Sequence, residues 1–240
     1  MAIGSAHAQN AWGDLSGQII VANKPANVIK AVPPVGCAGA VPPVKQDETL
    51  AVGAKGELAN VVIWVTTKGL KVNPALPPPP ANVNLDNVGC RFEPHVLGMQ
   101  VAQTLVLGNS DLAGHNSKIS PFASPGANPL IPAGQSVNFN FLASEGLPVK
   151  VECNIHPWMG AWVLARDNPY FAITDVNGKF TIKDLPVGQL EFRFWHEKPG
   201  YLKSLVIGGA MQVLKKGTLP QNIVAGVNNL GAIDADPKEF

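Results

Sequence analysis

Short apolar stretches separated by glycine, proline and asparagine recur along the whole chain. Examples are residues 17–21 (GQIIV), 105–107 (LVL) and 137–141 (VNFNF), the last with strict alternation of apolar and polar residues. This pattern predicts β-strands, because a half-buried strand points alternate side chains to the core and to solvent. No segment offers three turns of helical apolar spacing without glycine or proline, so we expect at most a turn or two of helix. The predicted fold class is all-β.

Two breaks divide this series of strands. The first is the run of four prolines at 77–80, which cannot join a sheet interior because proline has no backbone N–H. The second is Asp167-Asn168-Pro169. We therefore expect a leader at 1–16, one segment at 17–80, a central domain at 81–166 and a last segment at 167–240. The central domain is either an insertion within a flanking sandwich, which an exposed turn tolerates, or one of two sandwiches in tandem.

Length and charge exclude some functions. The 240 residues suffice for one large or two modest β-domains. The net charge of +1 gives no electrostatic case for nucleic acid or an anionic membrane as partner. Apolar runs such as 61–65 (VVIWV) are too short to be a transmembrane segment. Residues 6–8 (AHA) have the form of a signal-peptidase site without the usual apolar segment before it, so the leader is either a signal-peptide remnant or a plain N-terminal segment.

One short segment carries three potential metal ligands. Cys153, His156 and Met159 lie within seven residues (CNIHPWM). A thiolate and an imidazole can bind copper equatorially while a thioether binds weakly along the axis. A mononuclear site of this kind needs a second histidine, and His115 fits because it follows a strand that ends in a polar turn (LGNSDLAGHN, 107–116). The pattern predicts one type 1 copper ion bound by these four residues.

The same residues carry a resemblance to a known family. A strand, then Asn-x-Asp-x-x-x-His-Asn at 109–116, then Cys-x-x-His-x-x-Met at 153–159 resembles the cupredoxins, with a ligand loop similar to that of the amicyanins. Nearly the whole chain also resembles bacterial proteins labelled methylamine-utilisation or cupredoxin-like, which share CRFEPH (90–95), HPWM (156–159) and WHE (195–197). The resemblance implies a cupredoxin-like Greek-key β-sandwich, and implies that Asn116 steadies the ligand loop by hydrogen bonds.

The flanking segments resemble a second family. The motifs TDVNGKF (174–180) and LPVG (185–188), with looser matches at GQII (17–20) and GELANVV (56–62), resemble the carboxypeptidase regulatory-like β-sandwich. This resemblance implies a second sandwich of the immunoglobulin or transthyretin-like type beside the cupredoxin-like one.

The number of cysteines helps to predict the cellular compartment of the protein. Of the three cysteines, Cys153 lies in the ligand motif, whereas Cys37 and Cys90 lie in loop-like surroundings. This arithmetic favours a disulfide between Cys37 and Cys90 and one functional thiolate. A disulfide suits an oxidising compartment, so we expect a periplasmic or extracellular protein.

Other metal sites fit the sequence less well. Cys153 could be an inert buried thiol and Met159 an ordinary core residue, but this interpretation does not explain why both lie within seven residues together with His156. Structural zinc does not choose methionine. Pro157 stands where the loop of a binuclear copper centre needs a second cysteine, and five histidines are too few for an oxidase with a trinuclear cluster.

The remaining polar candidates have less specific patterns. For His95 we favour a hydrogen-bonded structural role, with an extra copper ligand or a group that tunes the ligands as the alternative. For His196 we favour a strand-end role over docking against the copper domain. Asp175, Asn177 and Gly178 have too few acidic positions for a calcium loop and predict a hairpin turn.

A closed copper site with only protein ligands moves single electrons, so we expect an electron carrier and no catalytic residue. A redox partner would dock near an exposed edge of His156, beside Pro157 and Trp158, with Trp158 and Phe122 forming an apolar shell. Two alternatives stay open. One is an open site, as in red copper proteins, which Met159 fails to close. The other is a copper-binding or storage protein with exchangeable metal.

Overall fold

The structure is a computed structural model, and residues 12–22, 37 and 48–240 are described. Within these residues the fold is all-β, as predicted, and the helical structure is one 3-10 turn at Pro237–Glu239. The chain divides into two compact units. Unit 1 holds the described residues before 23 together with Leu50–Pro77 and Tyr170–Phe240, and unit 2 holds Cys37, Glu48, Thr49 and Pro78–Pro169. Unit 2 therefore interrupts unit 1 twice in sequence, once before Leu50 and once from Pro78 to Pro169.

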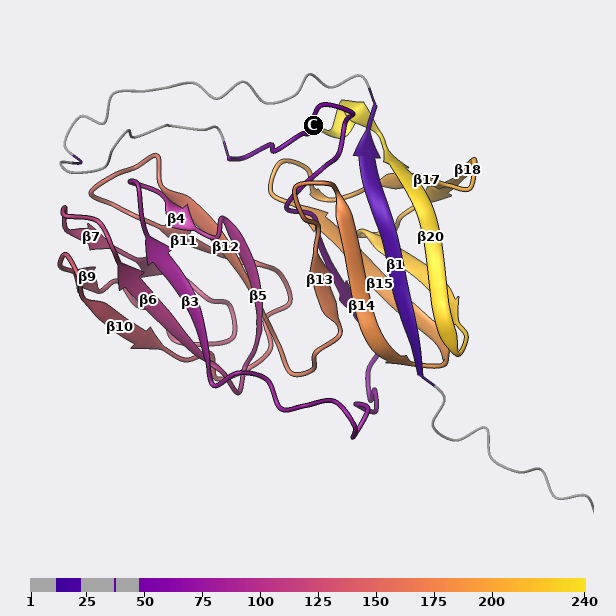
Figure 1. The fold of residues 1–240 in the computed structure, drawn as a ribbon, viewed down its shortest axis with the longest axis horizontal. Helices are drawn as coiled ribbons and strands as arrows, with labels where there is room; N and C mark the ends of the chain where they lie inside the picture. Colours follow the sequence, from indigo (N-terminus) through magenta and orange to yellow (C-terminus); the bar gives the residue numbers. More distant parts are fainter. Residues whose placement is uncertain (1–11, 23–36, 38–47) are drawn as a thin grey trace, which may run out of the picture. The chain divides into compact units, whose positions relative to one another are not determined.

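Unit 1 consists of two sheets around one apolar core (Figure 1). The first sheet has the order β14 (Lys179–Pro186), β1 (Trp12–Val21), β20 (Gly226–Ala235), β17 (Ser204–Ile207) and β18 (Ala210–Val213). The second has the order β13 (Phe171–Ile173), β2 (Val62–Val65), β15 (Gly188–His196) and β16 (Gly200–Tyr201), and β19 (Thr218–Ile223) also pairs with β15. Leu15, Ile19, Ile63, Phe192 and Ile233 lie in the shared core.

Two expectations about unit 1 need correction. Strand β1 begins at Trp12 and buries Leu15, so it occupies part of the segment that we expected to be a leader. The Asp175 turn is not a hairpin, because it joins β13 of one sheet to β14 of the other. The Asp175 carboxylate accepts hydrogen bonds from the N–H groups of Asn177 (2.8 Å) and Lys179 (2.9 Å), and Gly178 has a φ of +70°. These bonds explain the turn without a metal ion.

Unit 2 is a sandwich of two four-stranded sheets. One has the order β10 (Ser136–Phe139), β6 (Thr104–Asn109), β3 (Asn82–Asn87) and β4 (Phe92–Glu93). The other has the order β5 (Val96–Gln100), β12 (Gly160–Arg166), β11 (Val149–Glu152) and β8 (Lys118–Ile119). A separate pair joins β7 (His115–Asn116) to β9 (Leu130–Ile131). The sheets enclose a core that includes Leu85, Phe92, Leu107, Val151 and Val163, which is the kind of sandwich that the cupredoxin resemblance implied.

The cysteines are arranged as their count predicts. Cys37 and Cys90 form a disulfide, and Cys153 is a free, buried thiol. In the part of the chain that the structure describes, no helix is long and apolar enough to cross a membrane.

Candidate metal centre

The three clustered ligand candidates sit on a hairpin loop. Strand β11 ends at Glu152, strand β12 begins at Gly160, and these two residues pair directly. The intervening loop is closed by hydrogen bonds from the N–H of Cys153 to the C=O of Met159 (3.3 Å) and from the N–H of Met159 to the C=O of His156 (2.9 Å). A local hairpin therefore brings the backbones of all three residues together.

His115 reaches the loop through strand pairing. Strand β8 pairs antiparallel with β11, with Lys118 opposite Glu152. Asn116 lies two residues before Lys118, and its side chain contacts the N–H of Asn154, two residues after Glu152. The pairing of β8 with β11 therefore carries the His115-Asn116 pair to the ligand loop.

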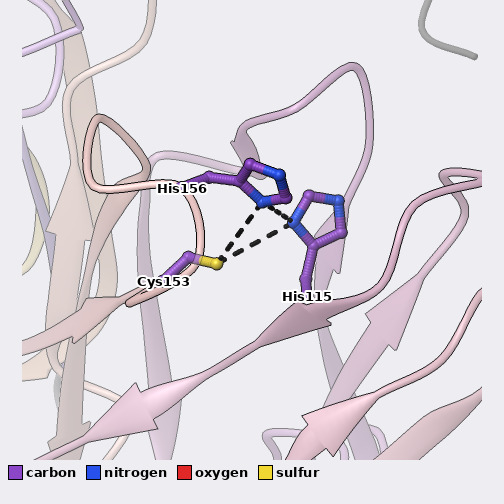
Figure 2. Close-up of side chains that lie close together, drawn as sticks. All are labelled: His115, Cys153 and His156. Atoms are coloured by element: carbon purple, nitrogen blue, oxygen red, sulfur yellow. Dashed lines mark hydrogen bonds between the residues drawn. The ribbon is translucent and has the colours of Figure 1, made fainter. Parts of the chain in front are cut away.

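The side chains of His115, Cys153 and His156 converge on one point (Figure 2). The two Nδ1 atoms lie 2.9 Å apart, and the Cys153 sulfur lies 3.9 Å from Nδ1 of His115 and 3.7 Å from Nδ1 of His156. The exposed fractions of the three residues are only 0%, 2% and 3% respectively. Two imidazole nitrogens and a cysteine sulfur facing one another match the donor types that type 1 copper takes.

Met159 supplies the fourth donor type. It is buried and packs in the same apolar cluster as Cys153. A set of two histidines, one cysteine and one methionine is typical of type 1 copper, so the residues present fit this ion.

Asn116 ties the ligand loop to strand β7. Its Oδ1 accepts hydrogen bonds from the N–H groups of Asn154 (2.9 Å) and Ile155 (3.2 Å), and lies 3.5 Å from the Cys153 sulfur. Its Nδ2 donates to Oδ1 of Asn128 at 2.6 Å. This is the role that the resemblance implied for Asn116.

Asp111 orients His115, a role that the sequence analysis missed. Its carboxylate oxygen Oδ2 lies 3.0 Å from Nε2 of His115, on the ring edge away from the cluster. A carboxylate here favours a proton on Nε2 and leaves the Nδ1 lone pair for a metal ion. The available signal was Asp in the Asn-x-Asp-x-x-x-His motif, four residues before the histidine.

Burial lowers the pKa of His115 below its usual value. The neighbouring His156 also lowers this pKa, whereas the hydrogen bond and charge of Asp111 raise it. Because the lowered pKa favours the neutral imidazole, Nδ1 of His115 stays available as a ligand over a wider pH range.

His95 lies outside this cluster. It is not among the described residues whose ligand atoms gather within 4.8 Å. Its Nδ1 lies 3.8 Å from a carboxylate oxygen of Glu48, and its C=O accepts the N–H of Trp162 at 2.9 Å. These contacts give His95 a structural role between two segments of unit 2.

Two expectations about the surroundings of the site are wrong. His156 is buried and presents very little surface, because only 3% of it is exposed. Phe122 is 74% exposed and so cannot form part of an apolar shell. Trp158 does contact the site, since its ring centroid lies 5.2 Å from that of His156.

His196 ends strand β15 in unit 1. Its ring is fully buried, Nδ1 accepts the N–H of Lys198 at 3.2 Å, and the ring packs edge-on against Phe240. These contacts match the strand-end role that we favoured.

Comparisons with known proteins give partial likenesses. No protein-family model and no curated protein matches the chain. Among solved structures, a Cu(I) mutant of amicyanin is 14% identical over 43% of this chain and 98% of its own, with a TM-score of 0.33. A purple cupredoxin from Nitrosopumilus maritimus is 21% identical over 36% of this chain and 99% of its own, with a TM-score of 0.30.

A copper-containing nitrite reductase from Thermus scotoductus is also similar to part of the chain. It is 21% identical over 40% of this chain, with a TM-score of 0.33, and the match spans only 25% of the reductase. The assignment of the metal centre therefore depends on its own donor atoms: His115, Cys153 and His156 converge in a buried site, with Met159 in the same loop.

Proposed function

We propose that the chain binds one type 1 copper ion through His115, Cys153, His156 and Met159 and serves as a single-electron carrier outside the cytoplasm. The observation that carries this proposal is the convergence of two Nδ1 atoms and one sulfur in a buried cluster. The disulfide between Cys37 and Cys90 supports a periplasmic or extracellular location.

The surrounding residues favour electron transfer over substrate chemistry. A bound copper ion supplies a Cu(I)/Cu(II) couple. Asp111 holds the ring of His115, Asn116 holds the backbone after Cys153, and the hairpin closes the loop. A framework held at several points resists rearrangement when the charge of the site changes. Burial of all four side chains limits the access of water and of a substrate, which favours a closed site over the open-site alternative.

The proposed partner is another redox protein, docking at the ligand loop. Pro157 is exposed, and Ile155 and Trp158 are 50% and 36% exposed on either side of the buried His156. A small apolar patch of this kind suits a weak, transient contact. Electrons would then cross the thin layer formed by these side chains rather than a bare histidine edge.

Cys153→Ser tests the proposal. We expect the copper-loaded wild type to show an intense visible charge-transfer band and a type 1 EPR spectrum, because both require the copper–thiolate bond. The serine variant should lose both. Cys37→Ser/Cys90→Ser should keep the band, since those sulfurs do not bind the metal. A band that survives in Cys153→Ser would place the copper elsewhere. Copper that exchanges freely with a chelator would favour the storage alternative.

A further inference from the structure

The peptide group of Cys90 contacts the support of His115. The two carboxylate oxygens of Asp111 accept hydrogen bonds from the N–H groups of Gly89 (2.7 Å) and Cys90 (2.9 Å). The oxygen that accepts from Cys90 is also the one that lies 3.0 Å from Nε2 of His115. One carboxylate oxygen thus joins Cys90 to a ligand ring.

The same peptide segment also contacts the ligand loop. The C=O of Cys90 accepts a hydrogen bond from the indole N–H of Trp158 at 3.0 Å. Trp158 lies between His156 and Met159 in the loop, and its ring packs beside that of His156. Cys90 is therefore bonded toward both chain segments that supply copper ligands.

The backbone conformation at this point needs external support. Gly89 and Cys90 have φ values of +64° and +58°, so two successive N–H groups turn toward one anion, as in other carboxylate-binding backbone nests. Glycine adopts this region freely, but a residue with a Cβ does so only when its surroundings hold it there. For Cys90, which is 4% exposed, the covalent bond to Cys37 is such a restraint.

We propose that Cys90 is a positioning residue of the copper site and that its disulfide to Cys37 is what keeps it in position. The cross-link holds the Gly89–Cys90 peptide groups against Asp111 and Trp158. These two side chains in turn set the orientation of His115 and the course of the ligand loop. The inference rests on the proposed copper function for its electrochemical test, but it also predicts a change in the metal-free protein.

The first experiment compares the wild type with Cys37→Ser/Cys90→Ser, both full-length and copper-loaded. We expect the variant to keep its visible band while its reduction potential shifts. A change in the Cu(I)/Cu(II) equilibrium of about tenfold corresponds to a shift of ~59 mV for one electron. The copper–sulfur bands in the resonance Raman spectrum should move as well. Unchanged potential and Raman bands would overturn the inference.

A double-mutant cycle tests whether the disulfide affects the copper site through Asp111 and Trp158. If the disulfide acts through Asp111 and Trp158, removing it should shift the potential less in the Asp111→Ala and Trp158→Phe backgrounds than in the wild type. Trp158→Phe keeps an aromatic ring and removes the N–H donor together with part of the ring volume, so this arm decides the question if Asp111→Ala does not fold. If the potential shifts caused by removing the disulfide and by Trp158→Phe are fully additive, the disulfide does not act through Trp158.

A stability control separates positioning from general loosening. Phe139→Leu shrinks a core residue of unit 2 on strand β10 and should lower the stability without shifting the potential. A shift as large as that of the disulfide variant would show that any loss of stability moves the potential, and the inference would be wrong.

The metal-free protein gives a readout that does not depend on copper. The ¹H–¹⁵N signal of the Trp158 indole should move when the disulfide is removed, because its acceptor on Cys90 is displaced. A static signal contradicts the positioning role. A wild type without a type 1 spectrum would instead contradict the proposed function, so the two failures are distinguishable.

Discussion

At the scale of single residues, the polar side chains of Asn109, Asp111 and Asn116 have separate tasks around His115. Asn109 donates from Nδ2 to the C=O groups of Ala113 and Ile131, both at 2.8 Å, and so closes the turn that carries Asp111. Asp111 orients the ring of His115, and Asn116 holds the ligand loop. Each contact satisfies a buried or half-buried polar group, which would cost free energy if left unpaired. These side chains therefore form a hydrogen-bonded support for His115 and for the neighbouring ligand loop.

Met159 should control the reduction potential more than copper affinity. A thioether is a soft, weak ligand that favours Cu(I), whereas the cysteine and the histidines supply most of the binding. We expect Met159→Gln, with its harder oxygen donor, to lower the potential, and Met159→Leu to raise it, while copper stays bound in both. Protein-film voltammetry on the three proteins is the measurement.

Leucine also serves as the volume-matched control, because Met and Leu exchange in cores at little cost. If all three potentials coincide, Met159 is not the axial ligand.

At the scale of elements, the site forms where a hairpin loop meets the end of a neighbouring strand. The β11–β12 hairpin carries three of the proposed ligands, and the short pairing of β8 with β11 brings the fourth close to them. Strand β8 has only two residues, Lys118 and Ile119, so its pairing with β11 is too short to hold His115 beside the ligand loop by itself. The Oδ1 atom of Asn116 adds two further bonds to the loop backbone and extends the contact.

Asn116→Ala should destabilise the metal-free protein. The change leaves the N–H groups of Asn154 and Ile155 without their acceptor, at a cost of about 1–3 kcal/mol in the free energy of unfolding. Asn116→Asp keeps an oxygen acceptor and should cost less. Urea unfolding of the metal-free variants is the measurement.

Asn138→Ala is the matched control, since Asn138 is exposed on strand β10 and surface changes of this kind cost within about 0.5 kcal/mol. Equal stabilities for Asn116→Ala and Asn138→Ala would show that the Asn116 bonds contribute nothing net.

At the scale of the whole molecule, unit 1 is assembled from segments on both sides of the Pro78–Pro169 insertion. Strand β2, before the insertion, pairs with β13 and β15, which follow it. Tyr170 is the first residue of unit 1 after the insertion and is fully buried. Its hydroxyl accepts the N–H of Asn73 at 3.2 Å and donates to the C=O of Lys71 at 3.0 Å. This side chain joins the two ends of the interruption.

The ionisation of Tyr170 should make unit 1 less stable at high pH. Burial raises the pKa of Tyr170 above 10.0, against the opposing effect of the hydrogen bond from Asn73. The unfolded chain loses this proton near the ordinary pKa, whereas the folded protein retains it. The contribution of Tyr170 to the free energy of unfolding is therefore complete below the ordinary tyrosine pKa. It is lost as the pH rises through the raised pKa of the folded protein.

Urea unfolding at about pH 8 and about pH 11 measures this effect, with Tyr170→Phe as the comparison. The phenylalanine variant has no group to ionise at this position and should lose less stability between the two pH values. Identical losses would show that Tyr170 does not contribute to the pH dependence.

Several features of this protein were predictable from sequence because they depend on residues near one another in the chain. The alternation of apolar and polar residues predicted an all-β fold, since a strand repeats every two residues. The seven-residue spacing from Cys153 to Met159 predicted a ligand loop, because a hairpin closes locally. The count of three cysteines, with one in the ligand motif, predicted the disulfide.

Other features depend on which distant segments meet, and no local pattern specifies that. His156 is buried beside the rings of His115 and Trp158, and His115 reaches this place from a distant part of the chain. The meeting of Gly89 and Cys90 with Asp111 gave these three residues a common role that their separate motifs did not indicate. Phe122 lies exposed, and the Asp175 turn joins two sheets, for the same reason. A side chain's burial and its hydrogen-bond partners are set by strand register and packing across the sandwich, which only the tertiary structure determines.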